Sequence, residues 1–209
     1  MQTEVIPITH PVALRHAVDV LHNGGVVAFP TDTVYGLAAW PFNRESIERL
    51  YRIKERNRSK AIALLLPEAR QLTVAARRVT PLARVLADTF WPGPLTLVVE
   101  RHPQLPDIIA PENSVGVRVP DHPGALSLLR MAGLLAVTSA NLSGAPNTTT
   151  AEEVLEQLQG RFHLLLDGGR TPGGVPSTVV DCRKEDLRVL RAGPIPQEEL
   201  EAALARSGL

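Results

Sequence analysis

The sequence is short of cysteine, of aromatic residues and of long apolar runs, and each shortage excludes a class of protein. Its 209 residues include one cysteine, Cys182, so the chain can form neither an internal disulfide nor a cysteine-cluster metal site. Aromatic residues make up 4% of the chain, which argues against a stacking platform for single-stranded nucleic acid. No apolar run approaches the roughly 18 residues of a membrane span, and residues 1–9 lack the features of a signal peptide. We therefore expect a cytoplasmic protein in which Cys182 is a small buried hydrophobic residue.

Several familiar site motifs are also missing. The sequence contains no G-x-x-x-x-G-K-[ST] loop and no G-x-G-x-x-G after a strand, which excludes the common ATP and dinucleotide sites. It has no G-x-S-x-G nucleophile elbow, and its six histidines show no metal-ligand spacing. We expect no resident metal site, and an ATP site would have to be of another kind.

The charge is balanced overall but uneven along the chain. The 22 acidic residues match 22 basic ones, nineteen arginines and three lysines, so the chain is not built mainly to neutralise a nucleic-acid backbone. Residues 49–60 nevertheless hold six cations and a single acidic residue, Glu55. This segment should create a local positive field.

Helical and strand patterns alternate along the whole chain without a linker or an internal repeat. This alternation predicts an α/β fold, a single domain over residues 1–209 with a twisted mixed β-sheet and flanking helices. Its core should span about residues 5–195, followed by a polar-capped C-terminal helix over 197–206. We expect the other helices at residues 12–21, 43–53, 80–90, 123–131 and, from a Thr150/Glu153 capping box, 150–160. The expected strands are 26–29, 61–66, 95–100, 115–119, 134–138, 162–166, 177–181 and 187–190.

Four segments place small polar or cationic residues at the ends of these elements, where open α/β sheets usually carry their sites. They are residues 30–36, 54–56, 138–144 and 167–177. Each also has a simpler interpretation: a solvated cationic face, side-chain-capped turns or a flexible glycine-rich loop. Taken together, cations and hydroxyls without a catalytic histidine or paired carboxylates suggest phosphate chemistry. Residues 167–176 are the candidate lid, because their glycines provide hinges.

An ordered set of short motifs gives a more specific indication. They are GGVVAFPTDTVYGL at 24–37, K-x-R at 54–56, WPGPLT at 91–96, VRVP at 117–120, SANLSG at 139–144, STVVD at 177–181 and LRAG at 190–193. Together they resemble the YrdC/Sua5 family of threonylcarbamoyl-AMP synthases, and the match runs from about residue 5 to 195. Each motif alone is weak, whereas the K-x-R and S-x-N pair within the ordered set is highly specific.

The resemblance implies a sheet that frames a positively charged cavity. It also implies a nucleotidyltransferase that converts L-threonine, bicarbonate and ATP into threonylcarbamoyl-AMP and pyrophosphate. The product would feed tRNA threonylcarbamoyladenosine modification together with partner proteins. Mg²⁺ would arrive with ATP, held by phosphates and water. The length fits the short, single-domain form of the family.

The same resemblance assigns candidate site residues, position by position. The expected catalytic set is Lys54, Arg56, Ser139 and Asn141. The expected ATP contacts are Arg56, Lys60, Ser114, Ser139, Asn147 and Arg191, and the expected L-threonine contacts are Thr33, Arg118 and Ser177. A guanidinium such as that of Arg118 can hold a carboxylate through two hydrogen bonds.

Two positions depart from the family pattern. Leu65 stands where the family commonly has a histidine at the threonine site, and Asn147 stands in place of a common serine. The first change bears on amino-acid affinity. Two alternatives to the synthase remain: an RNA-binding module of the same fold without synthase activity, and carbamoyl-adenylate chemistry on another acceptor. Weak direct binding of tRNA is compatible with the synthase and with carbamoyl-adenylate chemistry on another acceptor.

Overall fold

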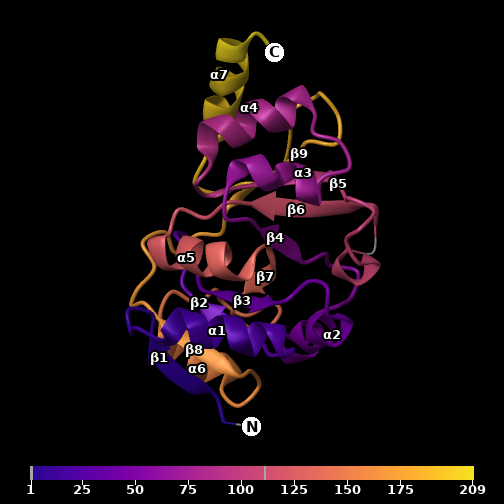
Figure 1. The fold of residues 1–209 in the computed structure, drawn as a ribbon. Coiled ribbons are helices and arrows are strands. Elements are labelled where there is room, and N and C mark those ends of the chain that lie inside the picture. Colours follow the sequence, from indigo (N-terminus) through magenta and orange to yellow (C-terminus); the bar gives the residue numbers. More distant parts are fainter. Residues whose placement is uncertain (1, 111) are drawn as a thin grey trace.

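Ten strands form one mixed sheet in the computed structural model, which describes residues 2–110 and 112–209. Their order is β1-β8-β2-β3-β7-β4-β6-β5-β9-β10, and the labelled strands rise in nearly this order from the bottom of Figure 1. The sheet contains both parallel pairs, such as β4 with β6, and antiparallel pairs, such as β3 with β7, so the predicted mixed sheet is confirmed. The strands are β1 (Glu4–Pro7), β2 (Val27–Phe29), β3 (Gly36–Ala39), β4 (Ala63–Leu65), β5 (Leu95–Glu100), β6 (Ser114–Arg118), β7 (Leu135–Ser139), β8 (Leu164–Asp167), β9 (Thr178–Asp181) and β10 (Arg188–Arg191).

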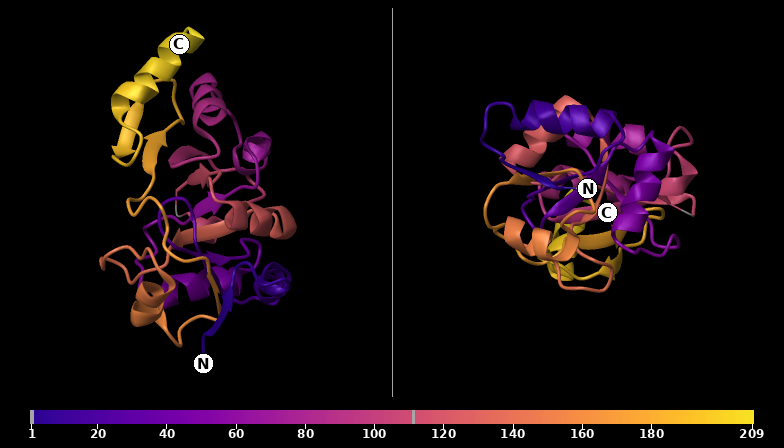
Figure 2. Two further views of the ribbon diagram at one scale, coloured as in Figure 1. Left: turned by 90° about the vertical axis from the view of Figure 1, so that its left-hand side faces the viewer. Right: turned by 90° about the horizontal axis from the view of Figure 1, so that it is seen from below.

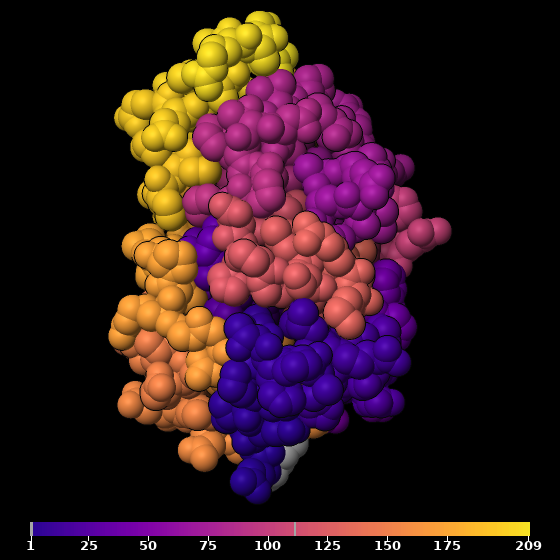
Figure 3. Space-filling view, turned by 60° about the vertical axis from the view of Figure 1, so that its left-hand side comes forward, coloured from indigo at the N-terminus to yellow at the C-terminus, as the bar shows by residue number. Residues whose placement is uncertain are grey.

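Helices cover both faces of this sheet. The α-helices are α1 (Ala13–His22), α2 (Arg44–Ile53), α3 (Leu72–Ala75), α4 (Pro81–Phe90), α5 (Pro123–Ala132), α6 (Ala151–Leu158) and α7 (Gln197–Ser207), with short 3₁₀ turns η1 (Ala69–Gln71) and η2 (Asp107–Ile109). The chain ends lie at opposite ends of the molecule (Figures 1 and 2). In Figure 3 the yellow C-terminal segment packs beside the magenta α4, and the indigo N-terminal segment lies beside orange residues. This agrees with the parallel pairing of β1 with β8. Within the described residues, no helix is long and apolar enough to cross a membrane.

Alternate residues of each strand enter one of two apolar clusters, as the period of two in a strand requires. Leu164 and Leu166 of β8 pack with α1 and α5, whereas Leu165 between them belongs to the cluster that includes α2, α4 and α6. Leu135 and Val137 of β7 likewise face α1 and α5. The sheet is therefore buried on both faces over much of its area, which explains the near-continuous apolar strands in the sequence.

Local capping explains where several helices begin. The side chains of Asn43, Thr80 and His122 each accept a hydrogen bond from a backbone N–H in the first turn of the helix that follows. Thr150 does the same for α6. The Glu153 carboxylate, however, accepts from the N–H of Thr149 at 2.6 Å, one residue earlier than a standard capping box.

The structure also corrects the sequence-based boundaries. α7 begins at Gln197 as predicted, but its N-cap is Pro196 and no side chain caps it, so the predicted polar cap is wrong. α6 ends at Leu158 rather than near residue 160, and the patterns missed β3, α3 and both 3₁₀ turns. The prediction that Cys182 is a buried hydrophobic residue is confirmed, since 1% of it is exposed.

Candidate functional site

A cavity of about 320 Å³ lies over six adjacent strands of the sheet, from β3 to β9. Two of its lining residues, Leu65 and Val137, belong to the cluster that packs under α1 and α5, so the cavity opens on that face. Residues opposite each other on neighbouring strands share a face. The floor accordingly consists of cross-strand pairs: Gly36 with Ser139, Val137 with Ala63, Leu65 with Arg118, Gly116 with Val98, and Thr96 with Val179.

Small residues keep this floor hollow. A Cβ atom on Gly36 would lie 2.8 Å from Cγ1 of Val137, and one on Gly116 would lie 3.1 Å from Cγ2 of Thr96. Both positions therefore exclude a larger side chain unless the floor moves. Gly36, within the motif at 24–37, and Gly116, directly before the motif at 117–120, thus keep the floor of the cavity low.

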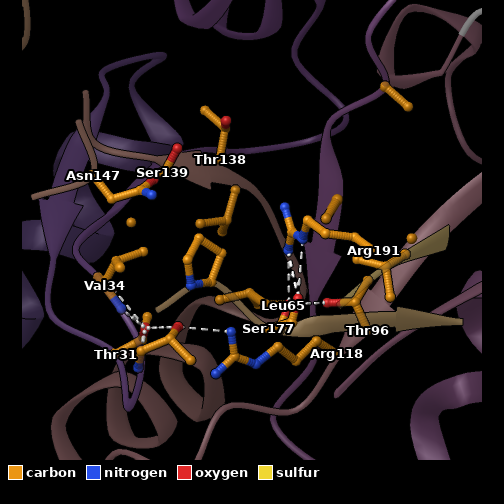
Figure 4. A pocket seen from close by; sticks show the side chains of 18 of the residues that line it. Thr31, Val34, Leu65, Thr96, Arg118, Thr138, Ser139, Asn147, Ser177 and Arg191 are labelled. Carbon is orange, nitrogen blue, oxygen red and sulfur yellow. Dashed lines mark hydrogen bonds between the residues drawn. The ribbon is translucent and has the colours of Figure 1, made fainter. Parts of the chain in front are cut away.

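Three arginines supply the charge of the cavity. Arg56, Arg118 and Arg191 line it, and its lining among the described residues includes no acidic side chain. Figure 4 shows Arg118 and Arg191 at one end, with Ser139 at the other. Such a lining attracts anions, because partly desolvated cations interact more strongly than they do in bulk water.

Three protein groups hold Arg118 in place. Its Nε donates to the carbonyl oxygen of Gly93 at 2.9 Å and its Nη1 to Oγ1 of Thr33 at 2.9 Å, while Nη2 donates to the carboxylate of Asp32. Only 6% of Arg118 is exposed. Burial lowers the pKa of its guanidinium, and the charge of Asp32 partly offsets this effect. The result is a fixed cation at the cavity floor.

Arg191 is anchored to the backbone and side chain of Ser177. Its Nε and Nη2 donate to the Ser177 carbonyl oxygen at 3.1 and 2.8 Å, and Nη2 also reaches Oγ of Ser177 at 3.2 Å. That hydroxyl shares a 2.8 Å hydrogen bond with Oγ1 of Thr96. Partial burial, with a smaller contribution from the charge of Arg118, lowers the pKa of Arg191. The two arginines thus line the same cavity, each held by groups of the protein.

A tight turn at the end of α2 separates the two cations of the K-x-R motif. Glu55 adopts a left-handed φ of 52°, its N–H bonds the carbonyl of Arg52, and the N–H of Arg56 bonds the carbonyl of Tyr51. This pairing is a Schellman turn, in which glycine is the usual left-handed residue. It sends Lys54 into the protein interior and Arg56 to the cavity.

Lys54 is buried outside the cavity lining and binds the S-x-N segment, residues 139–141. Its Nζ donates to the carbonyl oxygens of Ser139 and Asn141, both at 2.5 Å, and to Oδ1 of Asn141 at 3.2 Å. Burial, with a smaller effect of the Arg56 charge, lowers the pKa of Lys54 to about 7. The Asn141 amide in turn donates to the carbonyl oxygen of Ala145 at 2.7 Å. Lys54 and Asn141 thus fix the position of Ser139.

Arg56 closes a small ring with its own loop. Its Nη2 donates to the carbonyl oxygen of Ala61 at 2.8 Å and its Nε to that of Lys60 at 3.2 Å. Burial lowers the pKa of Arg56. The guanidinium is therefore oriented by backbone oxygens rather than by a carboxylate.

The glycine-rich segment 167–177 is tied to the loop that carries Thr33. Thr171 Oγ1 and the N–H of Gly174 both donate to the carbonyl oxygen of Thr33, at 3.1 and 2.7 Å. At Gly173 a Cβ would lie 2.6 Å from the carbonyl oxygen of Asp32, so only glycine allows this approach. Closure of the segment as a lid stays a prediction.

The structure brings together most of the residues predicted from the sequence. Those that line the cavity are Thr33, Arg56, Leu65, Arg118, Ser139, Asn147, Ser177 and Arg191. Among the described residues, Lys54, Asn141, Lys60 and Ser114 do not form part of its lining. Lys60 is exposed and offers its carbonyl to Arg56, and Ser114 begins β6 two residues before Gly116. The individual roles of all these residues stay predictions.

The residue-by-residue assignment did not include the lining hydroxyls of Thr31, Thr96 and Thr138, although Thr31 and Thr138 lie in two of the candidate segments. Thr96 ends the WPGPLT motif, so a signal was present, but its side-chain direction depends on strand register. Within the described ranges, no group of three or more His, Cys, Asp or Glu side chains could hold a metal ion.

Comparison with known proteins now gives the class of the chain. A family profile for Sua5, YciO and YrdC proteins, described as "Telomere recombination", matches residues 19–193. The chain belongs to this family.

Relatives with names and structures give the particular likeness. Threonylcarbamoyl-AMP synthase of Bacillus subtilis is 39% identical over 202 residues, covering 94% of this chain and 58% of the relative. The structure of P. abyssi Sua5 complexed with L-threonine matches with a TM-score of 0.88 and 37% identity, over 91% of this chain and 57% of that one. E. coli YciO matches with a TM-score of 0.84 and 26% identity, over 95% and 98% of the two chains. The chain thus spans less than two thirds of the first two of these relatives.

Proposed function

We propose that this protein is an L-threonylcarbamoyladenylate synthase, a nucleotidyltransferase that condenses L-threonine, bicarbonate and ATP and releases pyrophosphate. The observation that carries this proposal is a cavity with small residues in its floor and three oriented arginines in its lining. A site for one amino acid and one nucleotide needs room and positive charge, and the cavity offers both. The relative whose structure holds L-threonine supports the choice of amino acid.

The two ends of the cavity would bind different substrates. Arg118, Thr33 and Ser177 lie together and would bind the threonine carboxylate, while Ser139, Asn147 and Arg56 would bind ATP. A threonine carbamate oxygen would attack the α-phosphorus, and the bond to the pyrophosphate oxygen would break. Fixed arginines stabilise the charge of such a transition state without reorganising, and holding the reactants in line supplies the rest. Mg²⁺ would enter as Mg·ATP, its ligands being phosphate oxygens and water.

The proposal extends to the pathway in which the product is used. Threonylcarbamoyl-AMP is a reactive mixed anhydride, so a partner protein would have to transfer its acyl group to tRNA adenosine. This chemistry would take place in the cytoplasm. An RNA-binding module without synthase activity is the outcome expected if no adenylate forms.

The test is a direct assay of the purified protein. Incubation with ATP, L-threonine and bicarbonate should release pyrophosphate and form threonylcarbamoyl-AMP, detected by mass spectrometry. Omission of any one substrate should abolish the adenylate. Pyrophosphate release without threonine, or no adenylate with all three substrates, would overturn the proposal.

Arg56→Ala should lower kcat by about 10²- to 10³-fold, the scale for loss of one charge-stabilising donor. The fold should survive, because Arg56 is only partly buried and its contacts lie within its own loop. The matched control is Arg58→Ala, an exposed cation two residues away that does not line the cavity. Near-normal turnover of Arg56→Ala would mean that the K-x-R segment is a solvated cationic surface without a catalytic role.

A further inference from the structure

Asp32 forms a buried ion pair with Arg118 from outside the cavity. The side chains of Arg118 and Asp32 are 8% and 10% exposed, and Nη2 of Arg118 donates to Oδ1 of Asp32. Among the described residues, the cavity lining includes Arg118 but not Asp32. The carboxylate therefore backs the guanidinium rather than facing a ligand.

Asp32 itself is held by its surroundings. The Thr31 hydroxyl donates to the carbonyl oxygen of Val34 at 2.7 Å and accepts from the N–H of Val34, which closes a turn around Asp32. On its other side, Gly173 packs so closely that an added Cβ would lie 2.6 Å from the carbonyl oxygen of Asp32. The backbone that carries this carboxylate is thus fixed from two directions.

The contacts of Arg118 leave enough N–H donors unused to bind one further carboxylate. A guanidinium has five N–H donors, and Gly93, Thr33 and Asp32 each accept from one nitrogen. Two donors remain, the number that one carboxylate accepts. The local charge agrees with this count, because Arg118 and Arg191 against Asp32 leave one net positive charge at this end of the cavity.

We propose that Asp32 is a positioning residue for amino-acid binding. It fixes the rotation of the Arg118 guanidinium so that the two unused donors meet the carboxylate of the substrate. This inference rests on the proposed function, since it assigns the carboxylate to L-threonine. A neutral amide at position 32 would keep the shape but lose the charge-assisted hydrogen bond that orients the guanidinium.

The test compares Asp32→Asn with wild type in the adenylate assay and in threonine binding by calorimetry. The KM for L-threonine should rise roughly 10- to 150-fold, the range for one hydrogen bond to a charged group. The KM for ATP should stay unchanged. Asp121→Asn, the same substitution at an exposed site near His122, is the matched control and should leave both KM values unchanged. An unaltered threonine KM in folded Asp32→Asn would overturn the inference.

A double-mutant cycle separates positioning from a general structural effect. If Asp32 acts through Arg118, Asp32→Asn should not weaken threonine binding further in an Arg118→Ala background. An equal loss in both backgrounds would overturn the inference. Should Asp32→Asn fail to fold, Asp32→Glu keeps the charge but displaces the carboxylate, and it should raise the threonine KM several-fold; an unchanged value would count against positioning. Absence of adenylate from the wild type would instead refute the proposed function.

Discussion

Leu65 is the residue at which the cavity departs most from the family pattern. It lies on β4 opposite Arg118, is 5% exposed and lines the floor. A histidine there could share in binding the threonine carboxylate, whereas leucine can only pack. Under the proposed function, polar recognition of threonine would therefore fall to Arg118 and to the hydroxyls of Thr33 and Ser177.

Leu65→His should therefore tighten threonine binding by about 10- to 150-fold, the range for one hydrogen bond to a charged group. Binding of ATP should not change. Discrimination against serine should stay modest in both proteins, about 1 to 3 kcal/mol for one methyl group. Calorimetry with each ligand measures these effects. Loss of activity in Leu65→His, or unchanged binding, would show that position 65 does not belong to the amino-acid pocket.

Lys54 gives the fold a pH dependence that can be tested. Its pKa is about 7 in the folded protein, against about 10.4 in an unfolded chain. Between these values the unfolded state binds one more proton, so the free energy of unfolding rises with pH. The penalty of burying the ammonium is complete below about pH 7 and is relieved as the pH approaches 10.

Urea unfolding of wild type and Lys54→Met at about pH 7 and pH 9.5 tests this linkage. The stability of wild type relative to the variant should increase with pH, because the variant lacks the titrating group. Other groups titrate in both proteins and cancel in the comparison. A stability difference between the two proteins that does not change with pH would mean that the three oxygen acceptors keep the ammonium charged at both pH values.

At the scale of elements, the connection between β10 and α7 determines the position of Ser177. Gly193 packs directly on the backbone before β9, where an added Cβ would lie 2.3 Å from the Thr178 nitrogen and 2.6 Å from the Ser177 carbonyl carbon. Both atoms belong to the main chain and cannot rotate away from an added methyl group. This contact holds the Ser177 carbonyl, which accepts two hydrogen bonds from Arg191.

Gly193→Ala should therefore destabilise the protein by about 1 to 3 kcal/mol, as overpacking usually does. For a chain of this size that corresponds to a fall in Tm of roughly 2 to 12 °C. The threonine KM should also rise, because Ser177 and Arg191 move together. Ala192→Ser, at the exposed neighbouring position, serves as control. An unchanged Tm in thermal unfolding would contradict the proposed contact.

The order of the elements was largely predictable from the sequence, but their pairing was not. Apolar periodicity located most helices and strands, since these signals are local. β3 was missed because Gly36–Ala39 is short and shows no alternation, and it follows directly on the Thr31–Thr33 turn. The burial of Lys54 and the backing role of Asp32 depend on contacts with residues 139–141 and 118, which no local pattern reveals. Four segments were expected to form a site, and Thr31, Arg56, Ser139 and Ser177 of those segments do meet at one cavity.

For the whole molecule, a net charge of zero limits binding to RNA. The cations of the cavity and of residues 49–60 are balanced by acidic residues elsewhere, so the attraction to a polyanion is local. Affinity that depends on a few phosphate contacts falls steeply with salt because counterions are no longer released favourably.

Direct binding of tRNA should therefore be weak, and it should disappear between about 0.05 and 0.5 M salt. Fluorescence anisotropy of a labelled tRNA over this range provides the measurement. Arg56→Ala should weaken whatever binding occurs at low salt if the cavity mouth is the contact. Tight binding that persists at about 0.5 M salt would favour the RNA-binding module over the synthase.

The floor across six adjacent strands also links occupancy to the integrity of the whole sheet. The floor residues come from positions as distant in the sequence as Gly36 and Val179. They form one continuous surface only when every intervening strand is in register. The complete cavity exists only when all six strands are paired, so a ligand that contacts both of its ends binds the native state. At a free concentration of about 100 times its Kd, such a ligand adds about 2.7 kcal/mol to the free energy of unfolding. The protein should resist unfolding and proteolysis best when its substrates are abundant, and least when they are exhausted.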